Sequence, residues 1–430
     1  YYFKLGLIKM KLFYKYYKHI LIFFSIIFIC SLVFKKNETF RVLDQVLPNT
    51  IVGTIRFFTE INISPKKVNN DYNVKFLPKT QFAVFDFKKN KLPFVLNNDV
   101  GYLNILRKKP FVFDIYDDYV IVVPKNGTFH YQDLKDTILN KKKFNKITSN
   151  LDTNNVLDIF IDDQVIYVSY VKKIDNCIFL YLAKSQIDLI KLNFIDIFKS
   201  NECMSRNIQS GRIQKMKYYD DYFILLATAA DILNPNKNSK QDLKPQNDKS
   251  IYGKIISINL KNYNYSVFSK GHRNILGLSS INNVILSTEN GPRGGDEINR
   301  IYKDKNYGWP IASDGNKYVK DDAPPRGYKD HQDMNFEPPI FSFIPSIGIS
   351  EIIKIDNNFD KNWQNNYLIG SLFGKHIYRV RFNEKFDKVN YFEKIFVGER
   401  IRDLKYIPRY SAVLMALEGT GSIGILLNKN

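Results

Sequence analysis

The segment from Gly291 to Pro310 combines residue types suited to holding a cation or a planar ligand. It reads GPRGGDEINRIYKDKNYGWP, with several glycines, two adjacent carboxylates and a Tyr-Gly-Trp-Pro turn. Glycine and proline at this density fix a non-repetitive backbone, which can direct main-chain carbonyls at a hard cation or let a planar cofactor approach closely. We interpret the segment as a binding site. The simpler alternative is that Asp296 and Glu297 only cap a turn or pair with Arg293 or Arg300.

Short runs of β-branched and aromatic residues, separated by turn residues, dominate the chain after residue 36. The runs are Tyr119–Val123, Val165–Tyr170, Cys177–Leu182, Phe223–Thr228, Ile255–Leu260, Val284–Ser287, His376–Phe382 and Val413–Leu417. Long amphipathic helices are not evident, and roughly 350 residues of such strands exceed a simple sandwich. The pattern predicts an all-β fold, a six-bladed β-propeller over residues 76–430 with about 60 residues per blade.

An uncharged apolar run from Ile20 to Phe34 lies near the start of the chain, between lysines. It predicts an uncleaved transmembrane signal-anchor helix over residues 19–36, after a short cytoplasmic N-terminus (1–18) and before a linker (37–75). A cleaved signal peptide is the alternative. More positive charge precedes the run than follows it, which predicts a single-pass protein of the inner (cytoplasmic) membrane with its propeller on the periplasmic or extracytoplasmic side.

Composition excludes some classes of function. The chain has 63 Lys+Arg against 43 Asp+Glu, but the basic residues are spread along its whole length without a nucleic-acid-binding motif. We interpret the charge as a compositional bias and expect no nucleic acid partner. Cys177 and Cys203 either pair in an oxidising compartment or stay reduced, while Cys30 lies in the predicted anchor. No Cys/His spacing indicates zinc.

Three motifs in order resemble one known family. They are GHRNILGL at residues 271–278, the GPRGGDEIN loop and NYGWP at residues 306–310. Together they resemble the soluble quinoprotein glucose dehydrogenase and aldose sugar dehydrogenase family, from about Val156 to the C-terminus. The resemblance implies a six-bladed propeller that binds pyrroloquinoline quinone (PQQ) and calcium and oxidises sugars in the periplasm. The chain before Val156 matches the family only in its strand pattern.

PQQ is a tricarboxylate, so its site needs fixed cations, and arginine supplies planar bidentate donors for carboxylates. Alternation of period two directs Arg400 and Arg402 to one face of a strand, although such a pair is also common on an exposed strand. The resemblance assigns cofactor binding to Arg273, Asn274, Gly291, Pro292, Ser346, Arg400 and Arg402.

Calcium would polarise the quinone carbonyl as a Lewis acid and lock the loop. The resemblance places the cofactor-side ion on the backbone carbonyls of Gly291 and Pro292. It assigns the backbone carbonyls of Glu297 and Tyr307 to a second, structural ion, and we expect Asp314 and Glu337 to complete that site.

Oxidation of a sugar carbon requires a group that accepts the hydroxyl proton, and histidine suits this task. In the family this histidine precedes a short segment that ends in Gly-Arg; here the sequence RNIQSGR places Ile208 at its position. Isoleucine accepts no proton. Asp231 matches a second family acid and is the candidate catalytic base. We expect His272 to be structural, and His331 to be a surface residue.

Three functions remain open. The first is a membrane-anchored, quinone-dependent dehydrogenase of a small sugar or alcohol, with Asp231 as base and no electron acceptor assigned. The second is a non-catalytic propeller that binds PQQ or calcium. The third is a calcium-dependent lactonase or other hydrolase on a similar propeller. Loss of the histidine favours the second function, and retention of all three arginines favours the first.

Overall fold

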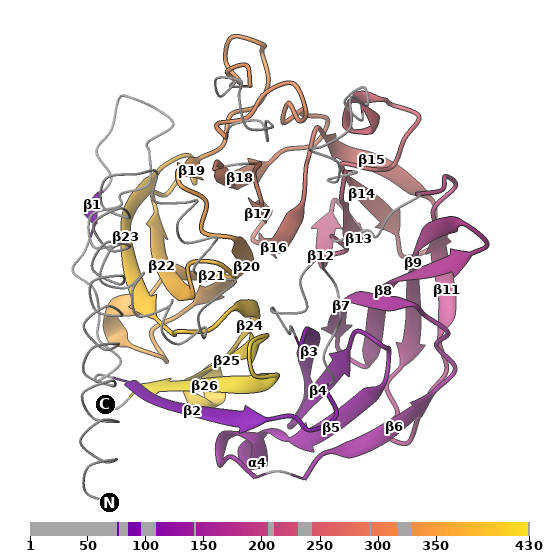
Figure 1. The fold of residues 1–430 in the computed structure, drawn as a ribbon, viewed down its shortest axis with the longest axis vertical. Helices are drawn as coiled ribbons and strands as arrows, with labels where there is room; N and C mark the ends of the chain where they lie inside the picture. The colour runs from indigo at the N-terminus through magenta and orange to yellow at the C-terminus, as the bar shows by residue number, and fades with distance from the viewer. Residues whose placement is uncertain are drawn as a thin grey trace, which may run out of the picture. The chain divides into compact units, whose positions relative to one another are not determined.

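The computed structural model of the chain describes residues 75–76, 85–95, 109–141, 143–204, 210–230, 243–292, 294–315 and 328–428. These residues form six sheets arranged in a ring (Figure 1). The six-bladed β-propeller predicted from the strand pattern is therefore confirmed. The predicted membrane anchor lies outside the described residues. Within the part of the chain that the structure describes, no helix is long and apolar enough to cross a membrane.

The first three blades follow one another along the chain. The first contains β3 (Phe111–Tyr116), β4 (Tyr119–Pro124), β5 (Phe129–Asp133) and β6 (Asn145–Ser149), with β10 (Lys191–Leu192) parallel at its edge and α4 (Leu134–Ile138) after β5. The second contains β7 (Asn155–Asp162), β8 (Val165–Ile174), β9 (Cys177–Gln186) and β11 (Ile195–Lys199). The third contains β12 (Ile213–Tyr218), β13 (Asp221–Thr228), β14 (Lys254–Asn259) and β15 (Tyr265–Lys270), with the 3-10 turn η3 (Lys244–Gln246).

The last three blades complete the ring. The fourth contains β16 (Ile275–Ile281), β17 (Val284–Glu289), β18 (Asp296–Ile301) and β19 (Phe341–Phe343). The fifth contains β20 (Ile349–Ile355), η4 (Lys361–Trp363), β21 (Asn366–Ser371), β22 (His376–Phe382) and β23 (Val389–Phe396), with β1 (Lys75–Phe76) parallel at its edge. The sixth contains β24 (Ile401–Ile407), η5 (Pro408–Tyr410), β25 (Ala412–Leu417), β26 (Ser422–Asn428) and β2 (Phe85–Lys91).

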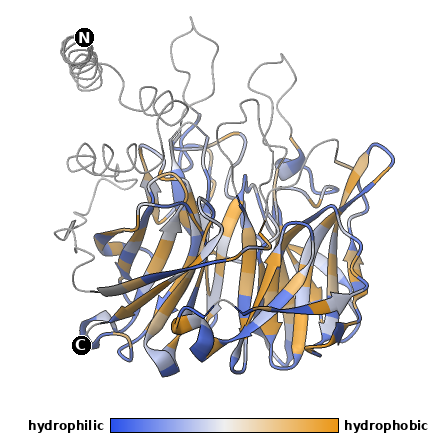
Figure 2. Cartoon of the chain, turned by 60° about the horizontal axis from the view of Figure 1, so that its bottom comes forward, coloured by the Kyte–Doolittle hydropathy of each residue, from blue (hydrophilic) through white to orange (hydrophobic). Residues whose placement is uncertain are grey.

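The apolar core is divided among the spaces between neighbouring blades. Six clusters of buried side chains occur, and each draws on two adjacent blades. Between the sixth and first blades, for example, Phe111 and Val120 belong to one cluster with Leu414 and Ile425. Apolar and polar residues succeed one another along the strands (Figure 2). Each sheet therefore buries its faces against its two neighbours, which is how a ring of sheets forms a continuous core.

Two segments far apart in the sequence pair in the sixth blade. Strand β2 pairs antiparallel with β26, from Phe85 opposite Asn428 to Lys91 opposite Ser422. The ring is thus closed by hydrogen bonds between segments far apart in the sequence. At the centre, the first strand of each blade (β3, β7, β12, β16, β20 or β24) contacts the first strand of the next. Side chains on these six strands therefore meet around the axis.

Candidate active site

A carboxylate within the Gly291–Pro310 segment holds its first turn in place. Asp296 accepts a hydrogen bond from Gly291 N at 3.0 Å and from Ile347 N and Ile349 N at 2.9 Å each. A Cβ at Gly291 would lie 1.9 Å from a neighbouring carbonyl oxygen, so only glycine fits. Asp296 makes no ion pair among the described residues, and burial raises its pKa. It therefore caps the turn, as the simpler interpretation proposed, and ties it to the segment that carries Ser346.

Glu289, at the end of β17, ties the GHRN segment to the same turn. Its carboxylate accepts a hydrogen bond from Arg273 N and lies 3.1 Å from Nδ1 of His272. The Nε2 atom of His272 lies 2.8 Å from Ser269 Oγ, and the ring stacks on Tyr307. Because both ring nitrogens are engaged and the side chain is buried, His272 has a structural role.

Two of the predicted cofactor-binding residues present buried polar atoms without a partner among the described residues. These atoms are Arg273 Nε and Asn274 Oδ1. The hydroxyl of Ser346, in contrast, interacts with the Asp296 carboxylate. The guanidinium of Arg273 is fixed elsewhere, because its Nη1 donates to Asn290 O at 2.7 Å and the group lies 5.3 Å from the Trp309 ring centroid. Buried polar groups are normally hydrogen-bonded, and an unsatisfied one costs free energy. A polar ligand would satisfy both atoms.

A small cavity lies at the Gly291–Pro292 turn. About 10 Å³ is available to the centre of a water-sized sphere, which is room for one water or ion. Burial, and then the charges of Glu289 and Asp314, raise the pKa of Glu297 well above its ordinary value. Glu289 and Glu297 both line the cavity, and the negative charge of one disfavours ionisation of the other. A bound cation would favour the ionised form of both carboxylates. The lining residues are Gly271, Arg273, Glu289, Asn290, Gly291, Pro292, Glu297, Tyr307, Trp309, Ala312 and Ser313.

The residues predicted to bind calcium do not all face this cavity. Those that line it are Gly291, Pro292, Glu297 and Tyr307. Asp314 follows the lining residue Ser313 and accepts a hydrogen bond from Ser342 Oγ at 2.6 Å. Glu337 lines a separate pocket. Within the described residues, no group of three or more His, Cys, Asp or Glu side chains is placed to hold a metal, so any ion here would need main-chain oxygens in addition to the carboxylates of Glu289 and Glu297.

Arg400 and Arg402 share one carboxylate. Nε of Arg400 lies 3.0 Å from Glu418 Oε2, and Nε of Arg402 lies 2.5 Å from Glu418 Oε1. Glu418 is fully buried, whereas the two arginine side chains are 21% and 20% exposed. Two guanidiniums on one carboxylate leave an excess positive charge at a partly solvated surface. Such a pair is suited to binding an anion, above all a carboxylate.

Arg212 connects this pair to a buried acidic network on the axis. Its Nη2 donates to Arg402 O at 2.9 Å. Its Nη1 lies 2.9 Å from both Asp158 and Glu351 and 3.4 Å from Asp403. Burial raises the pKa of Glu351 to about 8 and that of Asp158 to about 6, although Arg212 acts in the opposite direction. The network joins β7, β20 and β24, so it fixes the strands that carry the arginine pair.

Ile208, at the predicted histidine position, and Asp231, the predicted base, lie outside the described residues. Their described neighbours bond to the GHRN segment and the strand that follows it. Ser210 Oγ donates to a main-chain carbonyl at the start of β16 at 2.7 Å, and Ala230 N donates to Arg273 O at 2.9 Å. The chain therefore passes next to the arginine site immediately before Asp231.

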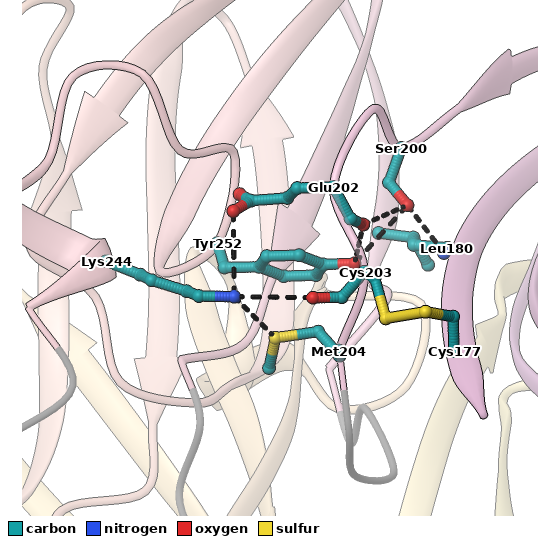
Figure 3. Close-up of a disulfide and its surroundings, with 8 residues drawn as sticks. All are labelled: Cys177, Leu180, Ser200, Glu202, Cys203, Met204, Lys244 and Tyr252. Atoms are coloured by element: carbon teal, nitrogen blue, oxygen red, sulfur yellow. Dashed lines mark hydrogen bonds and ion pairs between the residues drawn. A yellow bond between two sulfur atoms is a disulfide. The ribbon is translucent and has the colours of Figure 1, made fainter.

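Cys177 and Cys203 form a disulfide (Figure 3), which resolves the alternative that the sequence left open. Their Cα atoms lie 5.2 Å apart. Next to it, Ile178 and Met204 exchange two main-chain hydrogen bonds, and Lys244 Nζ donates to Cys203 O at 3.4 Å. The disulfide and these bonds anchor the chain four residues before position 208.

Sequence reasoning missed several residues that shape the site. Glu289 and Glu418 organise the arginines, but nothing in the residues around Glu418 indicates this role. The expectation that His331 is a surface residue was wrong: it is buried, with Nε2 3.9 Å from Glu297 Oε1, and burial lowers its pKa. Only the glutamate in the sequence Glu-Asn-Gly-Pro carried a signal, since it directly precedes the constrained turn.

Comparison with known proteins gives consistent matches. The model of the family described as Glucose / Sorbosone dehydrogenase matches residues 108–423. An aldose sugar dehydrogenase of Escherichia coli strain K12 is 32% identical over 161 residues, which cover 36% of this chain and 42% of that protein. The chain spans about half the length of the curated relatives it matches, 52% and 42% of two of them.

Solved structures share the fold. A crystal structure of a glucose dehydrogenase superimposes with a TM-score of 0.64 at 19% identity, and covers 76% of this chain and 99% of its own. The PQQ-bound form of an aldose sugar dehydrogenase from Streptomyces coelicolor has a TM-score of 0.50 at 15% identity, over 80% of this chain and 98% of its own. At these identities the likeness establishes the propeller alone.

Proposed function

The chain belongs to the glucose and sorbosone dehydrogenase family, and on that premise we propose that it is a PQQ-dependent dehydrogenase of a small sugar or alcohol. One observation carries the proposal. Arg273 and Asn274, which the resemblance assigns to the cofactor, present buried polar atoms without a partner among the described residues. A cofactor with carboxylate and carbonyl oxygens would supply an acceptor for the arginine.

The arginine pair is the second support for a tricarboxylate ligand. Arg400 and Arg402 carry two positive charges against the single carboxylate of Glu418, so a bound carboxylate would restore neutrality. When bound, the quinone accepts the hydride of the substrate carbon. The protein's contribution is to orient the cofactor: Trp309 lies against the Arg273 guanidinium, and Asp296 fixes the Gly291 turn.

We also propose a calcium ion at the Gly291–Pro292 turn. The cavity there has room for one ion-sized occupant, and Glu289, Glu297 and the Gly291–Pro292 turn line it. Oxygen donors of this kind suit Ca²⁺, which neutralises two buried carboxylates and polarises a carbonyl group. The ion would also stabilise the loop, because it satisfies charges that otherwise repel each other.

Asp231 is the proposed proton acceptor, since Ile208 replaces the family histidine. That replacement is also the observation that favours a second candidate, a propeller that binds the cofactor without oxidising a substrate. We further propose that the propeller is exported behind the N-terminal anchor. The Cys177–Cys203 disulfide supports this location, because such bonds persist in oxidising compartments.

The test is a titration of the purified protein with PQQ in the presence of Ca²⁺, followed by addition of aldoses and alcohols. We expect saturable binding and then the absorbance of the reduced cofactor. Arg402→Met removes a charged hydrogen-bond donor worth about 1.5–3 kcal/mol, so cofactor affinity should fall at least about tenfold. Arg409→Met, at an exposed arginine, is the matched control and should bind like the wild type.

The outcomes separate the two candidates. Absence of PQQ binding by the wild-type protein would refute the proposed function. Binding without reduction by any substrate of a broad panel would instead establish the non-catalytic alternative. Reduction that disappears in Asp231→Asn, while PQQ still binds, would identify Asp231 as the base.

A further inference from the structure

A cavity lies between the fourth and fifth blades, which are neighbours in the ring (Figure 1), and the proposed function does not use it. Arg300 and Tyr302 line it from the end of β18, Pro338 from the segment before β19, and Phe386 from the turn between β22 and β23. About 220 Å³ is available to the centre of a water-sized sphere, more than ten times the about 10–15 Å³ that one water requires. The cavity therefore has room for an organic ligand rather than a single ion.

Hydrogen bonds within the protein hold one wall of this cavity. Asn383 Oδ1 accepts hydrogen bonds from the main-chain N atoms of Asp387 and Lys388 at 3.1 Å each, which fixes the turn between β22 and β23. The guanidinium of Arg300 donates to the Lys385 carbonyl in the same turn, so the fourth blade is tied to the fifth. Because the turn is held without a ligand, the cavity is preformed, as binding sites for small molecules usually are.

Two aromatic residues contribute to the lining. Tyr302 is 37% exposed, and the Arg300 guanidinium lies 4.9 Å from its ring centroid. Phe386 packs against Tyr367, with 6.0 Å between the ring centroids, and has a φ of 53°, a left-handed conformation that bulky residues rarely adopt. Glycine or asparagine would adopt this backbone with less strain. An aromatic residue at such a position, in the lining of a cavity, points to a role for its side chain.

The charged residues of the lining balance one another. Arg300 and Lys388 are cationic, whereas Glu337 and Asp387 are anionic. A lining without excess charge gives neither an anion nor a cation an advantage, but it offers hydrogen-bond donors and acceptors together. The side-chain amide of Gln332 adds both kinds of group. The lining therefore suits a ligand that is neutral and polar and that has an apolar face.

We propose that this cavity binds a neutral saccharide, at a site separate from that of the cofactor. A pyranose ring presents a face of C–H groups and a rim of hydroxyl groups, and each hydroxyl both donates and accepts. The apolar surfaces of Tyr302, Pro338 and Phe386 suit the face, and the carboxylate, amide and guanidinium groups of the lining suit the rim. The inference goes beyond the proposed function and does not depend on it, because no residue of this lining is assigned to the cofactor.

Calorimetric titration of the full chain with maltotriose and with cellotriose, in the absence of PQQ, tests the inference. We expect saturable binding of at least one of them that does not change with salt, because a neutral ligand brings no charge to be screened. Tyr302→Ala should weaken binding at least about fivefold through loss of an aromatic contact. This variant keeps the hydrogen bond from the main-chain N of residue 302 to Tyr307 Oη, 2.9 Å in the wild type. Tyr265→Ala, at a tyrosine of the third blade that is 41% exposed, is the matched control and should bind like the wild type.

Three results would overturn the inference. The first is that neither trisaccharide binds to the wild-type protein. The second is that Tyr302→Ala binds as tightly as the wild type. The third is that trigalacturonate, an anionic trisaccharide, binds more tightly than both neutral ones, because this would show a site for anions.

Hydrogen exchange of the wild-type protein locates the ligand without any variant. Peptides that cover residues 300–302, 332–340 and 383–388 should exchange more slowly when the trisaccharide is bound. Protection confined to peptides that cover residues 271–292 would place the sugar in the candidate active site and would overturn the inference.

The two proposals fail independently. If the trisaccharides do not bind, the titration with PQQ still decides the proposed function. If PQQ does not bind but a trisaccharide protects the three segments from exchange, the proposed function is refuted and the saccharide site stands.

Discussion

Replacement of Arg212 by methionine should destabilise the propeller more at pH 8 than at pH 6. The side chain is buried, and its Nη1 atom contacts three carboxylates, those of Asp158 and Glu351 at 2.9 Å and that of Asp403 at 3.4 Å. Methionine has a similar length but no charge, so Arg212→Met leaves the acids without a guanidinium. Removal of one partner from a buried ion pair costs about 3–5 kcal/mol.

The pH dependence follows from the protonation of the same acids. The pKa of Glu351 is raised to about 8 and that of Asp158 to about 6 in the presence of Arg212. A carboxyl group with a raised folded-state pKa binds more protons folded than unfolded, so stability falls as pH rises through the interval between the two values. Arg212 lowers both pKa values, and its removal raises them further. Asp158 should then stay protonated from pH 6 to 8.

One additional bound proton changes stability by about 1.4 kcal/mol per pH unit, so the gap between wild type and Arg212→Met should widen by about 2–3 kcal/mol between pH 6 and 8. Urea unfolding, followed by circular dichroism with refolding verified, measures the gap at each pH. Arg409→Met, at a side chain that is 44% exposed, is the control. It should change the free energy of unfolding by less than about 1 kcal/mol at both pH 6 and pH 8. A gap that is equal at the two pH values would refute the reasoning.

Two further perturbations test the loops around the site. Cys177→Ser with Cys203→Ser opens a bridge of sequence separation 26, which by chain entropy should cost about 3.5 kcal/mol in urea unfolding; unchanged stability in both the variant and the reduced wild type would contradict this estimate. Chelation of Ca²⁺ should lower the unfolding temperature of the wild type, since a ligand at a hundredfold excess over its Kd contributes about 2.7 kcal/mol. Glu297→Gln should remove most of that response and Glu337→Gln, in a separate pocket, should keep it; the reverse result would locate the ion elsewhere.

The fold was predictable because the residues within most strands themselves favour extended structure. The run Val165–Tyr170 is rich in β-branched and aromatic residues and Val413–Leu417 is wholly apolar, and both lie within strands of the structure. Strand β2 (Phe85–Lys91) was not predictable in this way. Its sequence, FDFKKNK, is polar at five of seven positions, and it becomes a strand because β26 offers a free edge. Pairing with a distant segment leaves no periodic pattern in the sequence.

The candidate site was predictable where backbone geometry depends on residue type. The carbonyl oxygen of Gly295 leaves no room for a Cβ at position 291, so only glycine fits there. A glycine required in this way is visible in the sequence itself. Glu418 acts through two arginines 16 and 18 residues away, and His331 is buried by a fold that its neighbours do not encode. Charge pairing and burial of this kind arise from the closed ring, so they became visible only in three dimensions.

Binding and turnover depend on different parts of this pocket. The residues that would hold an anion, Arg273, Arg400 and Arg402, are fixed by Glu289 and Glu418, which belong to strands or strand ends of the propeller. The proton acceptor has no such support among the described residues, because the two positions predicted to decide it, Ile208 and Asp231, lie outside them. An arginine cluster needs an anion to balance its charge whether or not a substrate is oxidised. Cofactor affinity should therefore survive loss of the base, and measurement of binding before activity is what separates a dehydrogenase from a propeller that only retains its quinone.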